Sequence, residues 1–227
     1  MTELELPISA NTMVQLALRQ LSVPPGQKVL LYDVSWQEFE AILDELGNHR
    51  GSRLAYDNGV LEIWMPLPEH EYDKEIIGDL LKALLEELDV EFLTLGSTTF
   101  KNKQIGQGLE PDQCFYIKNE AVVRGKNRLD LTVDPPPDLA LEIDITSRTH
   151  PDIYQALKVP ELWQFDRVQL QIKILQNGEY IEVNESPNFP GMPLKKIILQ
   201  FLEDSKTAGR NTVMKAFRHW AREQKPL

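Results

Sequence analysis

Two carboxylates stand two residues apart in the apolar stretch LALEIDITSRTH, residues 139–150. Leucine and isoleucine occupy the odd positions from 139 to 145, while Glu142 and Asp144 occupy even positions. This alternation predicts a strand whose successive side chains point to opposite faces, and it places both acids on the same face. An acid in a buried strand is costly unless it is paired or binds a cation. Glu142 and Asp144 therefore each need a partner.

Asp112 is the acid best placed to be that partner, because it opens a second predicted strand, DQCFYI at residues 112–117. If the two strands are neighbours, Asp112, Glu142 and Asp144 bring together carboxylate oxygens. Mg²⁺ prefers such ligands and typically uses one or two protein carboxylates. In the alternative interpretation, Glu142 and Asp144 face solvent or pair with Arg148, and Asp112 starts a turn after a proline. The residues alone leave both interpretations open.

Histidines are the remaining candidates for acid–base chemistry. His150 stands directly before Pro151 and is suited to act as a general base or as a ligand, or else it simply begins a helix. His70, which lies between Glu69 and Glu71, is expected on the surface. The histidines show no H-x-x-x-H spacing, so the sequence carries no zinc motif of that kind.

Periodicity and turn residues predict the elements that must position these side chains. Ser35 and Glu38 form a capping box for a helix that ends at Gly47. Asn58-Gly59 predicts a hairpin turn. The longest helical pattern covers residues 69–88. Further predictions are a strand at 91–96, a loop at 97–111, a helix from 151 to about 158, strands at 161–166 and 168–175, a turn at 177–178 with a return strand, and a helix at 211–224. This order predicts a mixed sheet with helices on its faces, in an α/β (α+β) fold.

Composition limits the class of protein. The chain has 227 residues, of which 42% are hydrophobic, enough for one sizeable core. No run approaches the roughly 18 apolar residues of a membrane span, and the acidic N-terminus lacks the features of a signal peptide. We therefore expect a cytoplasmic protein that does not bind membranes. The single cysteine, Cys114, is expected as a small apolar strand residue.

Charge is unevenly distributed along the chain. The net charge of −11 opposes nonspecific binding of nucleic acid, since phosphate binding depends largely on Lys and Arg. Residues 101–128 nevertheless hold six basic residues against three acidic ones. A basic groove on an acidic body is therefore compatible with the sequence.

Several segments, in order along the chain, resemble the Uma2 family, also called DUF820, which is common in cyanobacteria and other bacteria. They are VLLYDVSWQEFEAILDELG, YDNGVLEIWMP, LGSTTFK, GLEPDQCFYI, PPPDLALEIDITS, IYQALKVPELWQFD and FRHWARE. Uma2 proteins belong to the restriction-endonuclease-like PD-(D/E)xK nuclease superfamily. The resemblance implies a mixed four- to five-stranded sheet flanked by helices, with additional β-hairpins in this chain. We expect one such domain at residues 28–227, after an N-terminal arm at residues 1–27.

The resemblance also implies a metal site and a reaction. In active members, the acids that match Asp112 and Glu142 hold Mg²⁺, together with the backbone carbonyl of the next residue, here Ile143. Mn²⁺ is a possible substitute. The implied reaction is the hydrolysis of DNA phosphodiester bonds, in which the metal polarises the scissile phosphate and lowers the pKa of an attacking water. A lysine usually positions that water.

The chain departs from the superfamily pattern at this lysine. Asp144 stands at the lysine position of the motif. His150 stands where many Uma2-like sequences carry a lysine instead, four residues before the tyrosine that matches Tyr154. We expect Asp144 and His150 to act as supporting catalytic groups. Lys101 or Lys103 is an alternative source of positive charge from the preceding loop.

Two functions remain open from the sequence. One is a Mg²⁺-dependent endonuclease acting on DNA, which the retained Asp112 and Glu142 favour. The other is a catalytically degenerate member that binds a protein or nucleic-acid partner, which the net charge and the missing lysine favour. A homodimer is the expected assembly, because related nucleases often dimerise, which would let two sites act on two strands, and because twofold pairs are the commonest soluble assemblies.

Overall fold

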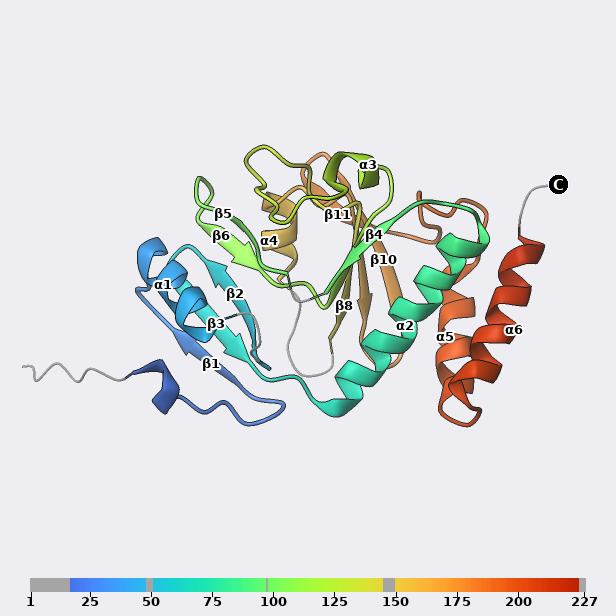
Figure 1. Ribbon diagram of the computed structural model, residues 1–227, viewed down its shortest axis with the longest axis horizontal. Coiled ribbons are helices and arrows are strands. Elements are labelled where there is room, and N and C mark those ends of the chain that lie inside the picture. The colour runs from blue at the N-terminus through green and yellow to red at the C-terminus, as the bar shows by residue number, and fades with distance from the viewer. Residues whose placement is uncertain (1–16, 48–50, 97, 145–149, 225–227) are drawn as a thin grey trace, which may run out of the picture.

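The computed structural model describes residues 17–47, 51–96, 98–144 and 150–224, which form two β-sheets and a set of helices (Figure 1). The helices are a 3₁₀ turn (Leu18–Gln20), α1 (Trp36–Leu46), α2 (Pro68–Glu87), α3 (Glu120–Val123), α4 (Pro151–Ala156), α5 (Leu194–Ser205) and α6 (Arg210–Glu223). The strands are β1 (Lys28–Leu31), β2 (Arg53–Asp57), β3 (Val60–Trp64), β4 (Leu93–Leu95), β5 (Phe100–Asn102), β6 (Gln107–Leu109), β7 (Gln113–Tyr116), β8 (Leu139–Ile143), β9 (Glu161–Phe165), β10 (Leu170–Gln176) and β11 (Glu179–Val183).

The first sheet has the strand order β1-β3-β2-β6-β5, with every neighbouring pair antiparallel. The predicted turn between β2 and β3 is confirmed, since Asn58 and Gly59 have φ angles of 44° and 97°. The prediction of a loop at 97–111 is wrong in part, because β5 and β6 pair there as a second hairpin. Each of these strands has three residues, which is too short for alternation to be recognised.

The second sheet has the order β11-β10-β9-β8-β7-β4 and is mixed, because β8 and β9 are parallel while the other neighbours are antiparallel. Strands β7 and β8 are direct neighbours, with Gln113 opposite Leu141. Continuing this register by one residue sets Asp112 opposite Glu142. The two strands that carry the predicted acids therefore lie side by side, and the predicted α/β architecture is confirmed, with the hairpins β2-β3 and β5-β6 in the first sheet and β10-β11 at the edge of the second.

Alternation along β8 separates a core face from a polar face. Leu139, Leu141 and Ile143 belong to the largest hydrophobic cluster, which includes side chains of α2, α5 and α6. Ala140 belongs instead to a second cluster, which joins α4 to both sheets. Glu142 shares the face of Ala140, so its carboxyl group points to the region between the sheets. Figure 1 shows α4 in this region, with α2, α5 and α6 on the opposite side of the second sheet.

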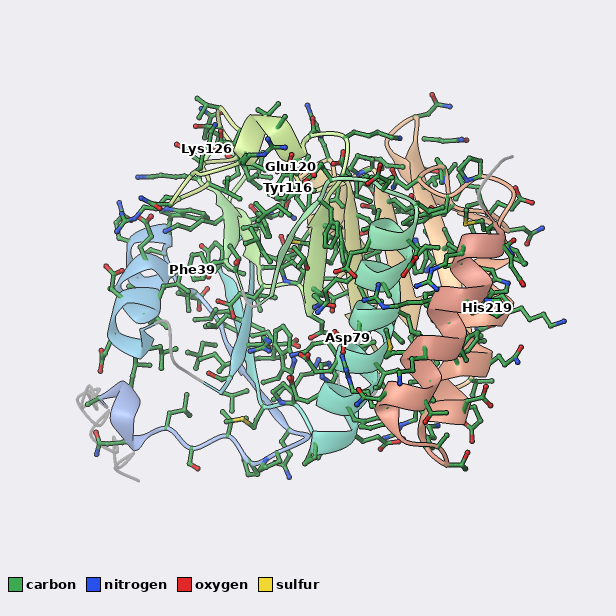
Figure 2. The ribbon with its side chains drawn as sticks, turned by 45° about the vertical axis from the view of Figure 1, so that its right-hand side comes forward. Phe39, Asp79, Tyr116, Glu120, Lys126 and His219 are labelled. Atoms are coloured by element: carbon green, nitrogen blue, oxygen red, sulfur yellow. The ribbon has the colours of Figure 1, made fainter. Side chains whose placement is uncertain are left out.

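Helix α1 covers the outer face of the first sheet. Its predicted capping box is confirmed, since the Ser35 amide donates to the Glu38 carboxylate at 2.7 Å and the Glu38 amide donates to Ser35 Oγ at 3.3 Å. Phe39 lies on the sheet side of α1 (Figure 2) and stacks on Tyr56 of β2, with ring centroids 4.6 Å apart. The inner face of this sheet, which carries Glu62, is thereby turned toward the second sheet.

Three helices form the cover of the second sheet. The helices predicted at 69–88 and 211–224 are confirmed as α2 and α6. Helix α5 lies in a segment for which the sequence analysis predicts no element, and it buries Leu194, Ile198 and Phe201 in the same cluster. Within the ranges that the structure describes, no helix is both long enough and apolar enough to cross a bilayer.

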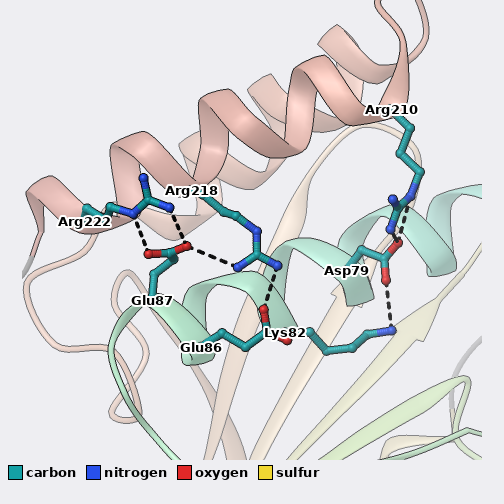
Figure 3. A network of polar contacts seen from close by, with 7 residues as sticks. All are labelled: Asp79, Lys82, Glu86, Glu87, Arg210, Arg218 and Arg222. Carbon is teal, nitrogen blue, oxygen red and sulfur yellow. Dashed lines mark hydrogen bonds and ion pairs between the residues drawn. The ribbon is translucent and has the colours of Figure 1, made fainter.

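Ion pairs add to the apolar packing between α6 and α2 (Figure 3). Arg222 donates to Glu87 at 2.7 and 3.0 Å, and Arg218 donates to Glu86 at 2.6 Å. Because these charges come from two separate helices, they favour one register of α6 along α2. This matters for the site because α2 also carries His70.

Asp79 is a largely buried acid of this network, with 19% of its side chain exposed. It accepts a hydrogen bond from Arg210 Nε at 3.1 Å and contacts Lys82 at 2.9 Å. Burial raises the pKa of Asp79, but the interactions with Arg210 and Lys82 outweigh burial and hold that pKa below its usual range. A carboxyl whose pKa is lower in the folded state stabilises the fold above its unfolded pKa of about 3.9. This contribution is lost as the pH falls through the folded-state pKa.

We predict that Asp79→Asn lowers the free energy of unfolding at neutral pH by about 0.2–1 kcal/mol, the usual range for such partly exposed pairs. The loss should shrink when high salt screens the pair. It should begin to shrink below about pH 4 and disappear as the pH falls through the lower folded-state pKa of the wild-type carboxyl. Urea unfolding across pH measures the difference. Glu45→Gln, an exposed acid of α1, is the control for net charge. An Asp79→Asn deficit that persists in acid would contradict the electrostatic explanation.

Candidate active site

Asp112 lies at the start of β7 and is 1% exposed. Its Oδ2 atom accepts a hydrogen bond from the backbone amide of Ile143 at 2.8 Å and contacts His70 Nε2 at 3.0 Å. Its other oxygen, Oδ1, is buried and has no hydrogen-bond partner among the residues that the structure describes. One side of the carboxylate is therefore fixed by the protein, while the other side is left for a further ligand.

Glu142 lies opposite Asp112 on β8 and is buried. The hydroxyl of Tyr154 on α4 donates a hydrogen bond to Glu142 Oε1. Burial raises the pKa of Glu142 well above its usual range, and the nearby Asp112 carboxylate raises it further. The alternative that Glu142 faces solvent is thus wrong, because α4 and the first sheet cover this face. Arg148, the suggested partner, lies outside the described residues.

His70 is buried rather than on the surface, so the prediction from its acidic neighbours is wrong. It is 1% exposed on α2, with Nε2 at 3.0 Å from Asp112 and Nδ1 at 3.5 Å from Glu71. Burial lowers the pKa of His70, but the hydrogen bonds to Asp112 and Glu71 outweigh it and raise the pKa to about 9. The imidazole is therefore a buried positive charge beside Asp112. Arg53 of β2 extends this chain of charges, at 3.5 Å from Glu71.

Asp144 lies just beyond β8 and is half-buried. Its Oδ2 accepts a hydrogen bond from Gln164 of β9 at 3.1 Å, and Gln164 in turn accepts one from Lys173 of β10. The register places Gln164 opposite Glu142 across the parallel pair. A polar row therefore crosses three strands on the face of the second sheet that points toward α4.

His150 stands at the first turn of α4, four residues before Tyr154. Its Nε2 lies 3.5 Å from Glu62 of β3, and Lys28 of β1 contacts the same carboxylate at 3.0 Å. The structure thus brings Asp112, Glu142 and Asp144 to one end of β8. It places His150 one helical turn from the tyrosine that holds Glu142.

Lysines supply no direct partner to the acidic pair. Lys101, on β5, donates to Glu40 of α1 at 2.8 Å, and Lys103 is exposed in the hairpin turn. Within the described ranges, no lysine forms an ion pair with Asp112 or Glu142. Among the described residues, the positive charge in contact with this pair is the imidazole of His70, through Asp112.

Sequence reasoning did not identify His70, Tyr154, Glu62 and Gln164 as parts of the site. For His70 a signal exists, because it lies seven residues before Ile77 and so extends the buried stripe of α2 by two turns. Glu62 alternates with two buried apolar residues of β3, which marks the opposite face of that strand. No local pattern indicates that β3 and α4 meet.

A divalent cation fits the pair formed by Asp112 and Glu142. The unpartnered Oδ1 of Asp112 and the adjoining Glu142 carboxyl are hard oxygen donors of the kind that Mg²⁺ selects. A cation also relieves the repulsion that two buried carboxylates create. The remaining neighbours, the His70 imidazole and the Tyr154 hydroxyl, hold these two acids in place.

Comparisons with known proteins identify the class of fold and then the family. A solved structure described as a "putative nuclease belonging to DUF820 from Anabaena variabilis ATCC 29413" matches with a TM-score of 0.51. The match covers 73% of this chain and 97% of that chain, at 12% identity, and it establishes the shared fold. The model of the Uma2 family, described as "Putative restriction endonuclease", matches residues 36–199, and the chain belongs to this family. A search of curated proteins finds no match.

We predict that His70→Ala lowers the free energy of unfolding by about 3–5 kcal/mol without added metal, because it removes the buried charge that Asp112 contacts. His219→Ala is the matched control, since His219 is 75% exposed on the outer side of α6 (Figure 2). It should unfold like the wild-type protein. Urea denaturation in a chelator measures both variants. Equal stability of the two variants would show that His70 does not hold Asp112.

Proposed function

We propose that this protein is a Mg²⁺-dependent endonuclease that hydrolyses DNA phosphodiester bonds. The observation that carries the proposal is the meeting of Asp112 and Glu142 on neighbouring strands, with Asp112 Oδ1 buried and unpartnered among the described residues. Membership of the Uma2 family supports a nuclease-type reaction. We propose DNA as the substrate and Mg²⁺ as the ion.

Asp112, Glu142 and the backbone carbonyl of Ile143 are the proposed ligands, with Mn²⁺ as a possible substitute for Mg²⁺. A bound divalent ion supplies polarisation of the scissile phosphate and a lower pKa for the attacking water. The protein supplies the geometry. His70 and the Ile143 amide restrict the rotation of the Asp112 carboxylate, and Tyr154 orients Glu142.

Asp144 and His150 are the proposed supporting groups. Asp144 is held by Gln164 and adds negative charge beside the ligands. His150 is the proposed acid–base group, because its ring is partly exposed and lies one turn from Tyr154. The site therefore combines a fixed pair of carboxylates with an imidazole in the place of a lysine.

A binding module without catalysis is the second candidate. It is favoured by the lack of a lysine ion pair with Asp112 or Glu142 in the described residues and by the net charge of −11. Such a protein binds a partner through the same region but leaves DNA intact. Metal binding and cleavage must therefore be measured separately.

For the metal, we predict that Mg²⁺ or Mn²⁺ at millimolar concentration raises the melting temperature of the wild-type protein. A ligand present at 100 times its dissociation constant stabilises the folded state by about 2.7 kcal/mol. Asp112→Asn should abolish the increase, since it removes a charged ligand. Asp152→Asn, an exposed acid on α4, should retain it. No increase in the wild-type protein would count against the metal site.

For the reaction, we predict that the wild-type protein nicks supercoiled plasmid DNA in the presence of Mg²⁺ and that a chelator stops the reaction. Asp112→Asn and Glu142→Gln should each abolish nicking, whereas Asp152→Asn should not alter it. Nicking that survives Asp112→Asn would indicate a contaminant or a different centre. A metal-dependent increase in melting temperature without nicking would favour the binding module.

A further inference from the structure

Glu62 on β3 and His150 at the start of α4 meet between the two sheets. His150 Nε2 lies 3.5 Å from Glu62 Oε2, and Lys28 contacts the same oxygen at 3.0 Å. Glu62 is 4% exposed, and its Oε1 atom has no hydrogen-bond partner among the described residues. Burying a carboxylate with an unpaired oxygen is costly, so the presence of Glu62 at this buried position calls for a physical reason.

We infer that Glu62 is a positioning residue, which holds His150 as the proton-transfer group of the active site in place of the superfamily lysine. The inference rests on the proposed nuclease function and deepens it. It gives β3, a strand of the first sheet, a role in the site, whereas Asp112 and Glu142 are carried by the second sheet.

The two nitrogens of the His150 imidazole have different roles in this proposal. A carboxylate 3.5 Å from Nε2 favours the neutral tautomer in which Nε2 carries the hydrogen and points it toward Glu62. Nδ1 then keeps its lone pair and is able to accept a proton. The His150 side chain is 39% exposed while its Nε2 is buried, so the ring is reached from a side other than Nε2.

The position of His150 links this pair to the acidic pair. His150 directly precedes α4, and the Tyr154 amide donates to its carbonyl at 3.4 Å, so the two residues lie one helical turn apart, about 6 Å along the axis. The Tyr154 hydroxyl donates to Glu142. Helix α4 therefore brings the imidazole and the tyrosine to the same end of β8.

The proposed step conserves atoms and charge. Nδ1 of neutral His150 takes a proton from the attacking water as the water oxygen forms its bond to phosphorus. The bond between phosphorus and the 3′-oxygen of the deoxyribose breaks, and that oxygen leaves with the bonding electrons and takes a proton from solvent. The imidazolium formed at His150 lies against Glu62, which compensates for its charge until the proton is released.

Lys173 is the rival source of positive charge. Its amine donates to Gln164, and Gln164 donates to Asp144 at 3.1 Å. This chain reaches Asp144, and the Lys173 amine is engaged by the Gln164 amide oxygen. We therefore assign proton transfer to His150, and Lys173→Met becomes one arm of the test.

Steady-state cleavage of a short DNA duplex with Mg²⁺ tests the inference. We expect His150→Ala to lower kcat by about 100-fold or more, the usual effect of losing a general base. Glu62→Gln should lower kcat by about 10-fold to 100-fold, as expected for a group that orients another. KM for DNA should stay within about twofold in both variants. The double variant should cleave no more slowly than His150→Ala, because both changes disable one unit.

Two measurements separate positioning from folding. The increase in melting temperature that Mg²⁺ causes in Glu62→Gln should match the wild-type increase, because this isosteric change leaves Asp112 and Glu142 intact. Lys28→Met removes the other partner of Glu62 but leaves its contact with His150. This control should retain kcat within about twofold. A loss equal to that of Glu62→Gln would show that Glu62 acts through its ion pair with Lys28 and would overturn the inference.

Other outcomes also overturn it. Wild-type rates in both Glu62→Gln and His150→Ala would remove His150 from the reaction. Cleavage that is lost in Lys173→Met but kept in His150→Ala would assign the role to Lys173. A wild-type protein that binds Mg²⁺ but cleaves no duplex would instead refute the proposed function itself, and this result is recognised before any variant is compared.

Discussion

The backbone amide of Ile143 donates to the Asp112 carboxylate at 2.8 Å, and the geometry of the site depends on this hydrogen bond. It joins the end of β8 to the residue just before β7, in the register that sets Gln113 opposite Leu141. A slip by one residue would turn the Glu142 carboxyl into the hydrophobic core and the Ile143 side chain toward the site. Apolar packing on one face and the polar contacts of Glu142 on the other therefore select the same register. The register of β7 and β8 and the position of the Glu142 carboxyl are therefore specified together.

The site also depends on how the two sheets are connected. Between β6 and β7 the chain leaves the first sheet and enters the second, and the Glu110 amide is still bonded to the Leu54 carbonyl of β2 at 3.1 Å. Two residues later, Asp112 contacts α2 through His70. Arg53 of β2 reaches the same helix through Glu71. The first sheet, α2 and the second sheet thus converge on Asp112, and the hairpins of the first sheet form one wall of the region that holds the site.

The sequence supports prediction where the signal is local. Alternation at 139–145 predicts a buried strand with two acids on one face, and the structure has that strand with Glu142 buried on the polar face. The burial of His70 and the contact between Glu62 and His150 are not predicted from the sequence, for different reasons. His70 stands between two glutamates, which suggest a surface position, although the helical stripe that includes Ile77 indicates burial. Glu62 meets His150 only because β3 and α4 pack together, and no spacing within one segment encodes such a contact.

Charge compensation explains how the fold tolerates these buried acids. Two carboxylates in contact cannot both ionise in a buried site without a compensating positive charge. In this chain Glu142 has a pKa well above its usual range because of burial and of Asp112, and the His70 imidazole, with a pKa of about 9, lies against Asp112. The superfamily lysine contributes positive charge from the strand itself, at the position where this chain has Asp144. Here the positive charge comes from His70 on α2, which contacts Asp112. Although the motif lysine is absent, the acids therefore have a compensating positive charge. His70 supplies the charge of that lysine but not its role in proton transfer, which requires another group.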